Sequence, residues 1–272
     1  MARDSSLAFS ILFETGTIKK MRNKQDLRIF ARYTPEESVP TSGEIRQKCV
    51  SPDKAIVEQK LVRARMIANQ LARTPFVRLL AVGNSVAMGT ATELSDIDFF
   101  VVTAANRLWT ARFFLLIKAK WLGLTKRPGK LADQADFGFW VDETALDLSP
   151  IAIENDVYLK LWLATLIPLV DRGGVYERLM MKNYESRIKN YEFSTQEVEN
   201  HTSIFETILN SRLGELIEKL LFWIQRWKVW REPITHHSSP LTINGRRVDV
   251  VTTRHMLKLH HFDQRAKFRD EK

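Results

Sequence analysis

The chain has 272 residues, of which 44% are hydrophobic, so it can bury a substantial core in one large or two small domains. Its one cysteine, Cys49, excludes a disulfide within the chain and is typical of proteins from reducing compartments. The net charge of +9 lies mainly at the two ends: residues 1–74 carry 14 basic and 8 acidic side chains, and residues 246–272 carry 8 and 4.

The charge distribution and the apolar runs limit the kinds of partner that this chain is expected to have. Basic ends around a slightly acidic centre fit either a phosphate-rich partner such as RNA or solvated tails. The first residues lack the apolar region of a signal peptide, and lysines interrupt the later apolar runs before they reach the roughly 18 residues that span a membrane. We therefore expect a cytoplasmic protein with no membrane partner, and the oligomeric state is left open.

The N-terminal part of the chain is predicted to be helical. Residues 1–30 indicate a weak helix, and residues 31–54, rich in Pro, Ser, Thr and Glu, indicate a linker or a broken helix. Apolar residues recur every three or four positions between 55 and 72, which predicts an amphipathic helix that ends at Thr74-Pro75.

The central part is predicted to contain two buried strands. The apolar run 76–82 indicates the first, and a Gly83-Asn84-Ser85 turn follows it, with a helix opening within the small and polar residues up to 94. The run Ile-Asp-Phe-Phe-Val-Val (97–102) indicates the second strand. Residues 106–123 then form an amphipathic helix that stops at Gly123.

The remaining elements complete the predicted fold. We expect a strand at 135–141, a hairpin partner at 145–151, a helical run from Asp156 to a Gly173-Gly174 break, and further helices at 175–192, 195–231 and 251–270. The fold class is α+β: a small mixed β-sheet core with flanking helices. The expected organisation is an N-terminal helical segment (1–74), the core (75–170) and a C-terminal helical domain (171–272).

Two aspartates stand at the head of the second strand. Because side chains alternate along a strand, Asp96 and Asp98 point to the same face. Two like charges so close repel each other unless a cation lies between them. Mg²⁺, or Mn²⁺ in its place, is typically held by one or two carboxylates together with substrate phosphates. The spacing therefore predicts a metal site, with solvated acids as the alternative.

The turn before this pair predicts a place for an anion. Backbone N–H groups around Gly83, Asn84 and Ser85 would face a phosphate if the chain turns sharply after the first strand. A phosphate cradle opposite a metal site is suited to phosphoryl-type transfer.

The whole stretch V-G-N-S-V-A-M-G-T-A-T-E-L-S-D-I-D-F-F-V-V (82–102) resembles the signature of the DNA polymerase beta-like nucleotidyltransferase superfamily. Arg107-Leu108-Trp109-xx-Arg112, the FxFWVxExALDL run from 137 and LKLHHFDQR from 257 are also similar to an uncharacterised bacterial nucleotidyltransferase family with helical extensions. The superfamily motif covers about twenty residues.

The resemblance implies a nucleotidyltransferase core and assigns roles by position. Asp96 and Asp98 match the two metal-binding carboxylates, and Ser85, with Gly83 beside it, matches the turn that contacts the phosphates of a bound NTP. Asn84 stands where the superfamily usually has glycine, although asparagine tolerates a left-handed backbone better than most residues. Arg112 could reach the triphosphate, and an exposed helix face explains it equally well.

Members of the superfamily also carry a third carboxylate on a later strand, where it activates the attacking hydroxyl. Asp136 is the first candidate for that role here, and Asp147 is the second. The expected activity is transfer of a nucleoside monophosphate from an NTP to a hydroxyl of RNA, a protein or a small molecule. The alternatives are a catalytically inactive binding or regulatory module of the same fold, or the nucleotide-modifying half of a toxin–antitoxin pair.

Overall fold

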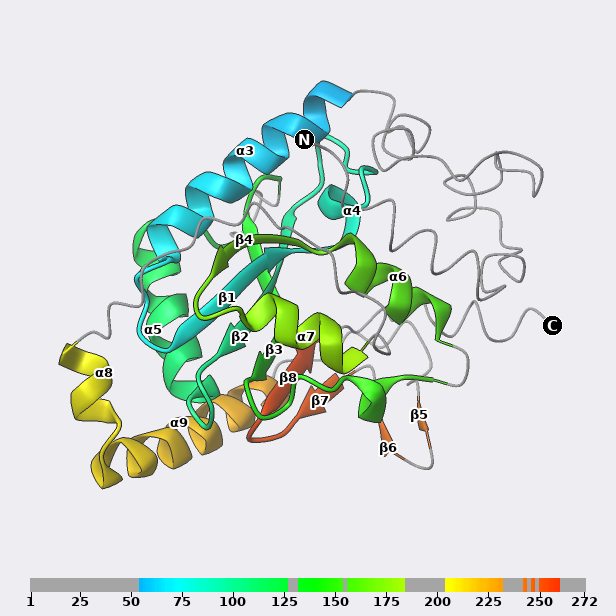
Figure 1. Cartoon of the computed structure of the whole chain (residues 1–272). Coiled ribbons are helices and arrows are strands. Elements are labelled where there is room, and N and C mark those ends of the chain that lie inside the picture. Colours follow the sequence, from blue (N-terminus) through cyan, green and yellow to red (C-terminus); the bar gives the residue numbers. More distant parts are fainter. Residues whose placement is uncertain are drawn as a thin grey trace.

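A computed structural model describes residues 54–126, 132–153, 156–183, 204–231, 242–243, 246–247 and 250–259. In this part of the chain seven helices accompany a six-stranded mixed sheet (Figure 1). The helices are α3 (Lys54–Leu71), α4 (Asn84–Ala87), α5 (Leu108–Trp121), α6 (Val157–Thr165), α7 (Val175–Asn183), α8 (Ile204–Leu209) and α9 (Arg212–Arg231).

The main sheet has the strand order β4-β1-β2-β3-β8-β7. Its strands are β1 (Val77–Val82), β2 (Ile97–Thr103), β3 (Ala135–Asp142), β4 (Ile167–Asp171), β7 (Val250–Thr252) and β8 (Met256–Leu259). The β2–β3 pair is parallel, with α5 as its crossover, and the other pairs are antiparallel. The short strands β5 (Thr242–Ile243) and β6 (Arg246–Arg247) form a separate ladder.

Both faces of the sheet are covered, which gives the molecule three layers (Figure 1). One core cluster packs residues of α3 and α5 against one face, and a second packs α6 and α7 against the other. Along β2, Phe99 and Val101 enter the first cluster, and Phe100 and Val102 enter the second. This strict alternation explains why β2 is an unbroken apolar run from Phe99 to Val102.

Several predicted elements are confirmed. The helices expected at 55–72 and 106–123 appear as α3 and α5, and the strands expected at 76–82, 97–102 and 135–141 appear as β1, β2 and β3. Strong periodicity and clear stop signals marked all of them in the sequence. The α+β fold class is likewise confirmed by the mixed sheet.

Three predictions about the second half were wrong. Residues 145–148 form no strand, and a 3-10 turn follows at Ser149–Ile151. The helical run from Asp156 stops after Thr165, where the chain continues as strand β4. Residues 250–259 form the β7–β8 hairpin instead of the start of a helix, so the part expected to be a helical domain supplies two strands of the main sheet. The rest of the predicted 251–270 helix lies outside the described residues.

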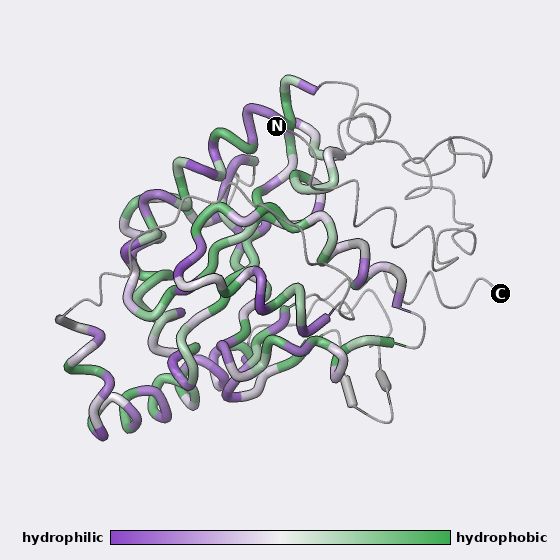
Figure 2. Tube along the Cα trace, viewed as in Figure 1, coloured by the Kyte–Doolittle hydropathy of each residue, from purple (hydrophilic) through white to green (hydrophobic). Residues whose placement is uncertain are grey.

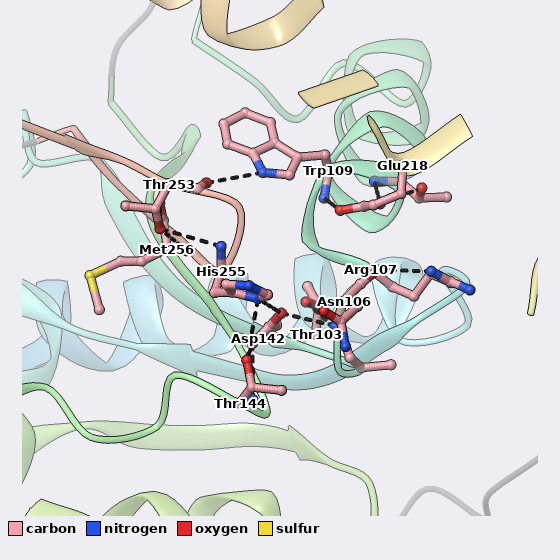
Figure 3. Close-up of polar contacts among 12 residues, drawn as sticks. Thr103, Asn106, Arg107, Trp109, Asp142, Thr144, Glu218, Thr253, His255 and Met256 are labelled. Atoms are coloured by element: carbon pink, nitrogen blue, oxygen red, sulfur yellow. Dashed lines mark hydrogen bonds and ion pairs between the residues drawn. The ribbon is translucent and has the colours of Figure 1, made fainter. Parts of the chain in front are cut away.

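A buried carboxylate joins the β7–β8 hairpin to β3 (Figure 3). The Asp142 side chain, which is fully buried, accepts from the backbone amides of Asn106 and Thr144 at 2.9 Å each and contacts His255 Nδ1 at 2.8 Å. The Trp109 indole donates to the Thr253 carbonyl at 3.2 Å. These long-range contacts hold the C-terminal hairpin at the β3 edge.

None of the helices in the described part of the chain combines the length and the apolar character that crossing a bilayer requires.

Candidate functional site

Three aspartates meet where the parallel strands β2 and β3 begin. Asp96 directly precedes β2, Asp98 is the second residue of β2, and Asp136 is the second residue of β3. The parallel register places Asp98 opposite Asp136. One carboxylate oxygen from each residue lies within 4.8 Å of the others. Asp136, the first candidate for the third acid, is therefore part of the cluster.

The loops that deliver these acids are held by a buried lysine of α3. The Lys60 ammonium donates to the carbonyls of Glu93 and Ser95 at 3.1 and 2.7 Å, and it lies 2.9 Å from the Asp133 carboxylate. Ser95 stands next to Asp96, and Asp133 lies three residues before Asp136. The Lys60 ammonium thus holds both segments that lead into the acid-bearing strands. Because these partners satisfy its hydrogen bonds, this lysine can be only 2% exposed in the core.

A second lysine bridges two of the three acids. The Lys126 ammonium bridges the carboxylates of Asp96 and Asp136. It follows α5 by five residues, in the connection that leads to β3, and its side chain is 35% exposed. Lys126 thus provides positive charge beside Asp96, one of the two predicted metal ligands.

Burial and like charge make Asp98 the most perturbed acid. Desolvation, followed by the charges of Asp96 and Asp136, raises the pKa of Asp98 to about 7, while a hydrogen bond from the Asn84 side chain and the charge of Lys126 oppose that rise. Burial lowers the pKa of Lys126, but its contacts with the two acids outweigh burial and raise that pKa above its ordinary value. Positive charge among the acids therefore favours the ionised form of Asp98.

The Gly83-Asn84-Ser85 turn lies against the cluster. The Gly83 amide donates to the Asp98 carbonyl at 3.0 Å, so this N–H group holds the turn onto β2 and is used there. Asn84 adopts the left-handed conformation with φ of 49°, as the asparagine at this position predicts. Its side chain also hydrogen-bonds to the Asp98 carboxyl, a contact that a glycine could not make.

Helix α4 begins directly at this turn and is a single turn long. The amides of Asn84 and Ser85 open the helix, where geometry provides no intrahelical acceptor for them. Gly83 packs closely on α6: an added Cβ would lie 3.0 Å from the Trp162 indole nitrogen, so the indole would have to shift to admit a side chain. The Trp162 ring is itself fixed by stacking on Phe139, with ring centroids 5.3 Å apart. The turn is thus held closely between α6 and β2.

Two predicted site residues lie elsewhere. Arg112 is one turn into α5, whose N-terminal end follows the opposite end of β2, and its guanidinium donates to the Gln225 side chain of α9 at 2.6 Å. Asp147 is exposed and accepts from the Ser149 amide at 2.9 Å within its own turn. The structure does not bring either residue to the acid cluster.

Sequence reasoning missed the two lysines of this site. Lys60 lies among the polar positions of an amphipathic helix, and Lys126 lies in a basic Lys-Arg-Pro-Gly-Lys loop that reads as a solvated surface. Neither position carries a motif, because each lysine acquires its role only through residues that are distant in the chain. The side-chain role of Asn84 was missed for the same reason.

The residues present fit a divalent cation. Three carboxylates with oxygens within 4.8 Å of one another form a hard oxygen ligand set, which suits Mg²⁺ and Mn²⁺. The bridging ammonium of Lys126 shows that the cluster accommodates a cation between Asp96 and Asp136. A metal that binds the same oxygens would have to displace this ammonium.

Comparisons with protein-family models, with curated proteins and with solved structures find no match to this chain. The acid cluster and its surroundings are therefore the basis on which a function can be assigned.

Proposed function

We propose that the chain is a nucleotidyltransferase that transfers a nucleoside monophosphate from an NTP to an acceptor hydroxyl. The observation that carries the proposal is the convergence of Asp96, Asp98 and Asp136 on adjacent parallel strands, beside a tight turn hydrogen-bonded to β2. Three acids next to the backbone amides at the start of α4 suit a reaction in which charged phosphates must be held and oriented.

The NTP and the acceptor hydroxyl are the two reactants. The acceptor oxygen attacks the α-phosphorus, the bond between that phosphorus and the oxygen leading to the β-phosphorus breaks, and pyrophosphate leaves. The proton of the acceptor hydroxyl passes to the carboxylate of Asp136, the third acid. Positioning and charge stabilisation supply most of the acceleration in phosphoryl-type transfer. The main contribution of the fold is therefore that it holds the three carboxylates in fixed positions.

The remaining residues have roles in binding. Asp96 and Asp98 would hold Mg²⁺ or Mn²⁺, which when bound supplies charge neutralisation for the phosphates. The amides at the start of α4 and the hydroxyl of Ser85 would contact the phosphates, and Asn84 would orient Asp98 through its side-chain hydrogen bond. Lys126, once released from the acids, would contact the phosphates or the pyrophosphate.

The test is incubation of the purified chain with each α-labelled NTP and Mg²⁺ or Mn²⁺, alone and with total RNA. The matched variants are Asp96→Asn/Asp98→Asn, which removes two charges at nearly constant volume, and Asp147→Asn, which alters an exposed acid outside the cluster. Label transferred by the wild type and by Asp147→Asn, and lost in the double variant, supports the proposal. Equal transfer by all three proteins, or none by any with every NTP and acceptor, contradicts it.

The nature of the labelled product identifies the acceptor class. RNA remains a proposed acceptor because of the basic chain ends, although residues 1–53 and 260–272 lie outside the described part. Label on RNA that falls steeply with added salt would support this acceptor. Label on the protein itself or on a small molecule would replace it.

The bridging contact of Lys126 favours a second function, that of a nucleotidyltransferase fold without catalysis. A lysine that neutralises two acids can substitute permanently for a metal, and such a site would bind a partner or nucleotide without turnover. NTP binding that is unaffected by EDTA, together with no transfer of label, would select this alternative over the enzyme.

A further inference from the structure

Helix α9 exposes an apolar face that its packing on α5 leaves uncovered. Seven of its large apolar side chains are 52% to 63% exposed: Leu213, Leu216, Leu220, Trp223, Ile224, Trp227 and Trp230. We call these residues the α9 stripe. Hydrophobic and hydrophilic positions alternate along this helix, which lies at the edge of the molecule (Figure 2). Contiguous exposed apolar surface of this kind marks an interaction site.

The opposite face of α9 is fixed to the fold. The buried Glu218 carboxylate accepts from the backbone amides of Trp109 and Thr110 at 2.8 Å each, at the start of α5 (Figure 3). Gln225 donates to the Trp109 carbonyl at 2.9 Å and accepts from Arg112 at 2.6 Å. Because these contacts fix the rotation of α9 about its axis, the stripe is held facing outward.

The spacing of the stripe is that of a helix–helix seam. Apart from Ile224, its members follow one another at steps of three, four, three, four and three residues from Leu213 to Trp230. Two apolar positions in every seven is the pattern by which the side chains of one helix insert between those of another. The regular three–four spacing therefore favours a helical partner.

Basic residues flank the seam along one edge and at its C-terminal end. At 100° per residue, Lys219 and Arg226 lie along one edge, which also carries the exposed Glu215 in the first turn, and Lys228 and Arg231 lie beside the last turn. The Arg226 guanidinium lies 5.5 Å from the centre of the Trp223 ring, and that of Arg231 lies 4.4 Å from the Trp227 ring. A guanidinium stacked in this way keeps N–H groups available for carboxylates. The seam thus carries net positive charge along one edge and at its C-terminal end.

We propose that the α9 stripe binds an amphipathic helix of a second protein, apolar at the same spacing and acidic along the edge that meets Lys219 and Arg226. Charge complementarity disfavours a second copy of this chain, because antiparallel pairing of two stripes would place their Lys219 and Arg226 edges together. Single-stranded nucleic acid would stack on the three indoles but would leave the leucine half of the stripe unused. This inference does not depend on the proposed activity.

The test uses the full chain and designed peptides. One peptide of about three heptads carries leucine at the seam positions and glutamate at the flanks, and its control carries lysine at the flanks. Binding is measured by titration calorimetry and by the tryptophan fluorescence of α9. We expect the glutamate peptide to bind at least about tenfold more tightly than the lysine peptide, with a preference that falls as salt is added.

Two variants of the chain make the test specific. Trp223→Ser/Trp227→Ser removes apolar surface from the exposed face and should abolish binding, with circular dichroism confirming that the fold is kept. Arg226→Glu/Arg231→Glu retains the stripe and offsets the charges of Lys219 and Lys228 at its edges, so it should lose the preference for the glutamate peptide.

Several results would overturn the proposal. These are equal binding of the two peptides, no binding of the glutamate peptide, and an unchanged preference in Arg226→Glu/Arg231→Glu. Self-association of the wild-type chain that the tryptophan variant abolishes would instead identify a second copy as the occupant. Stripe-dependent binding of anionic vesicles or of single-stranded RNA, with the glutamate peptide excluded, would identify a membrane or a nucleic acid.

Discussion

Replacing Asp98 by asparagine should stabilise the metal-free protein at neutral pH. The folded structure raises the pKa of Asp98 from 3.8 to about 7 because the carboxyl is desolvated and lies beside two other acids. Each pKa unit corresponds to about 1.4 kcal/mol, so ionised Asp98 lowers the free energy of unfolding by at most about 4 kcal/mol. Asparagine at this position carries no charge and avoids that cost.

The pH dependence has a definite sign. Between pH 3.8 and about 7 the folded chain binds more protons at Asp98 than the unfolded chain does. The stability of the wild type therefore falls, relative to Asp98→Asn, as the pH rises through this window, and the difference is fully developed above the upper value. Near the lower value the carboxyl is largely protonated in the folded state, so the two proteins should be almost equally stable.

Urea unfolding in EDTA across this pH range measures the difference directly. Asp147→Asn is the matched control, because it makes the same substitution at an exposed acid whose acceptor oxygen is retained. Added Mg²⁺ should narrow the advantage of Asp98→Asn above neutrality, since a cation among the acids removes part of the cost. Equal or lower stability of Asp98→Asn near pH 8 would refute the reasoning.

Two further substitutions test the charges that organise the site and α9. Lys126→Met removes the ammonium that bridges two acids, so Mn²⁺ should bind to it several-fold more tightly than to the wild type or to the exposed-lysine control Lys120→Met. Electron paramagnetic resonance of free Mn²⁺ measures the binding. Unchanged or weaker binding would contradict competition between Lys126 and the metal. Glu218→Ala leaves buried backbone amides of α5 without their acceptor, so it should lower the free energy of unfolding in urea by about 3 kcal/mol. Glu215 is exposed on the same helix, and Glu215→Ala should lower it by only a few tenths of a kcal/mol. Equal losses in the two glutamate variants would show that the Glu218 contact adds nothing to stability.

Local patterns were sufficient for the first half of the fold. The helices α3 and α5 and the strands β1, β2 and β3 follow from periodicity, apolar runs and stop signals that lie within each segment. The second half depended on long-range pairing. β8 has the sequence Met-Leu-Lys-Leu, which suits a helix equally well, and it becomes a strand because β3 has a free edge to pair with.

For the acid cluster, the sequence by itself determined the pair and the turn. Alternation along a strand places Asp96 and Asp98 on one face, and the Gly-Asn-Ser turn before β2 requires a left-handed residue that asparagine provides. Only the tertiary structure decided whether Asp136 or Asp147 lies beside Asp96 and Asp98, because this depends on the parallel register of β2 and β3. The same holds for Lys126, since an ammonium acquires its partners only when separate strands bring their carboxylates within a few ångströms of it.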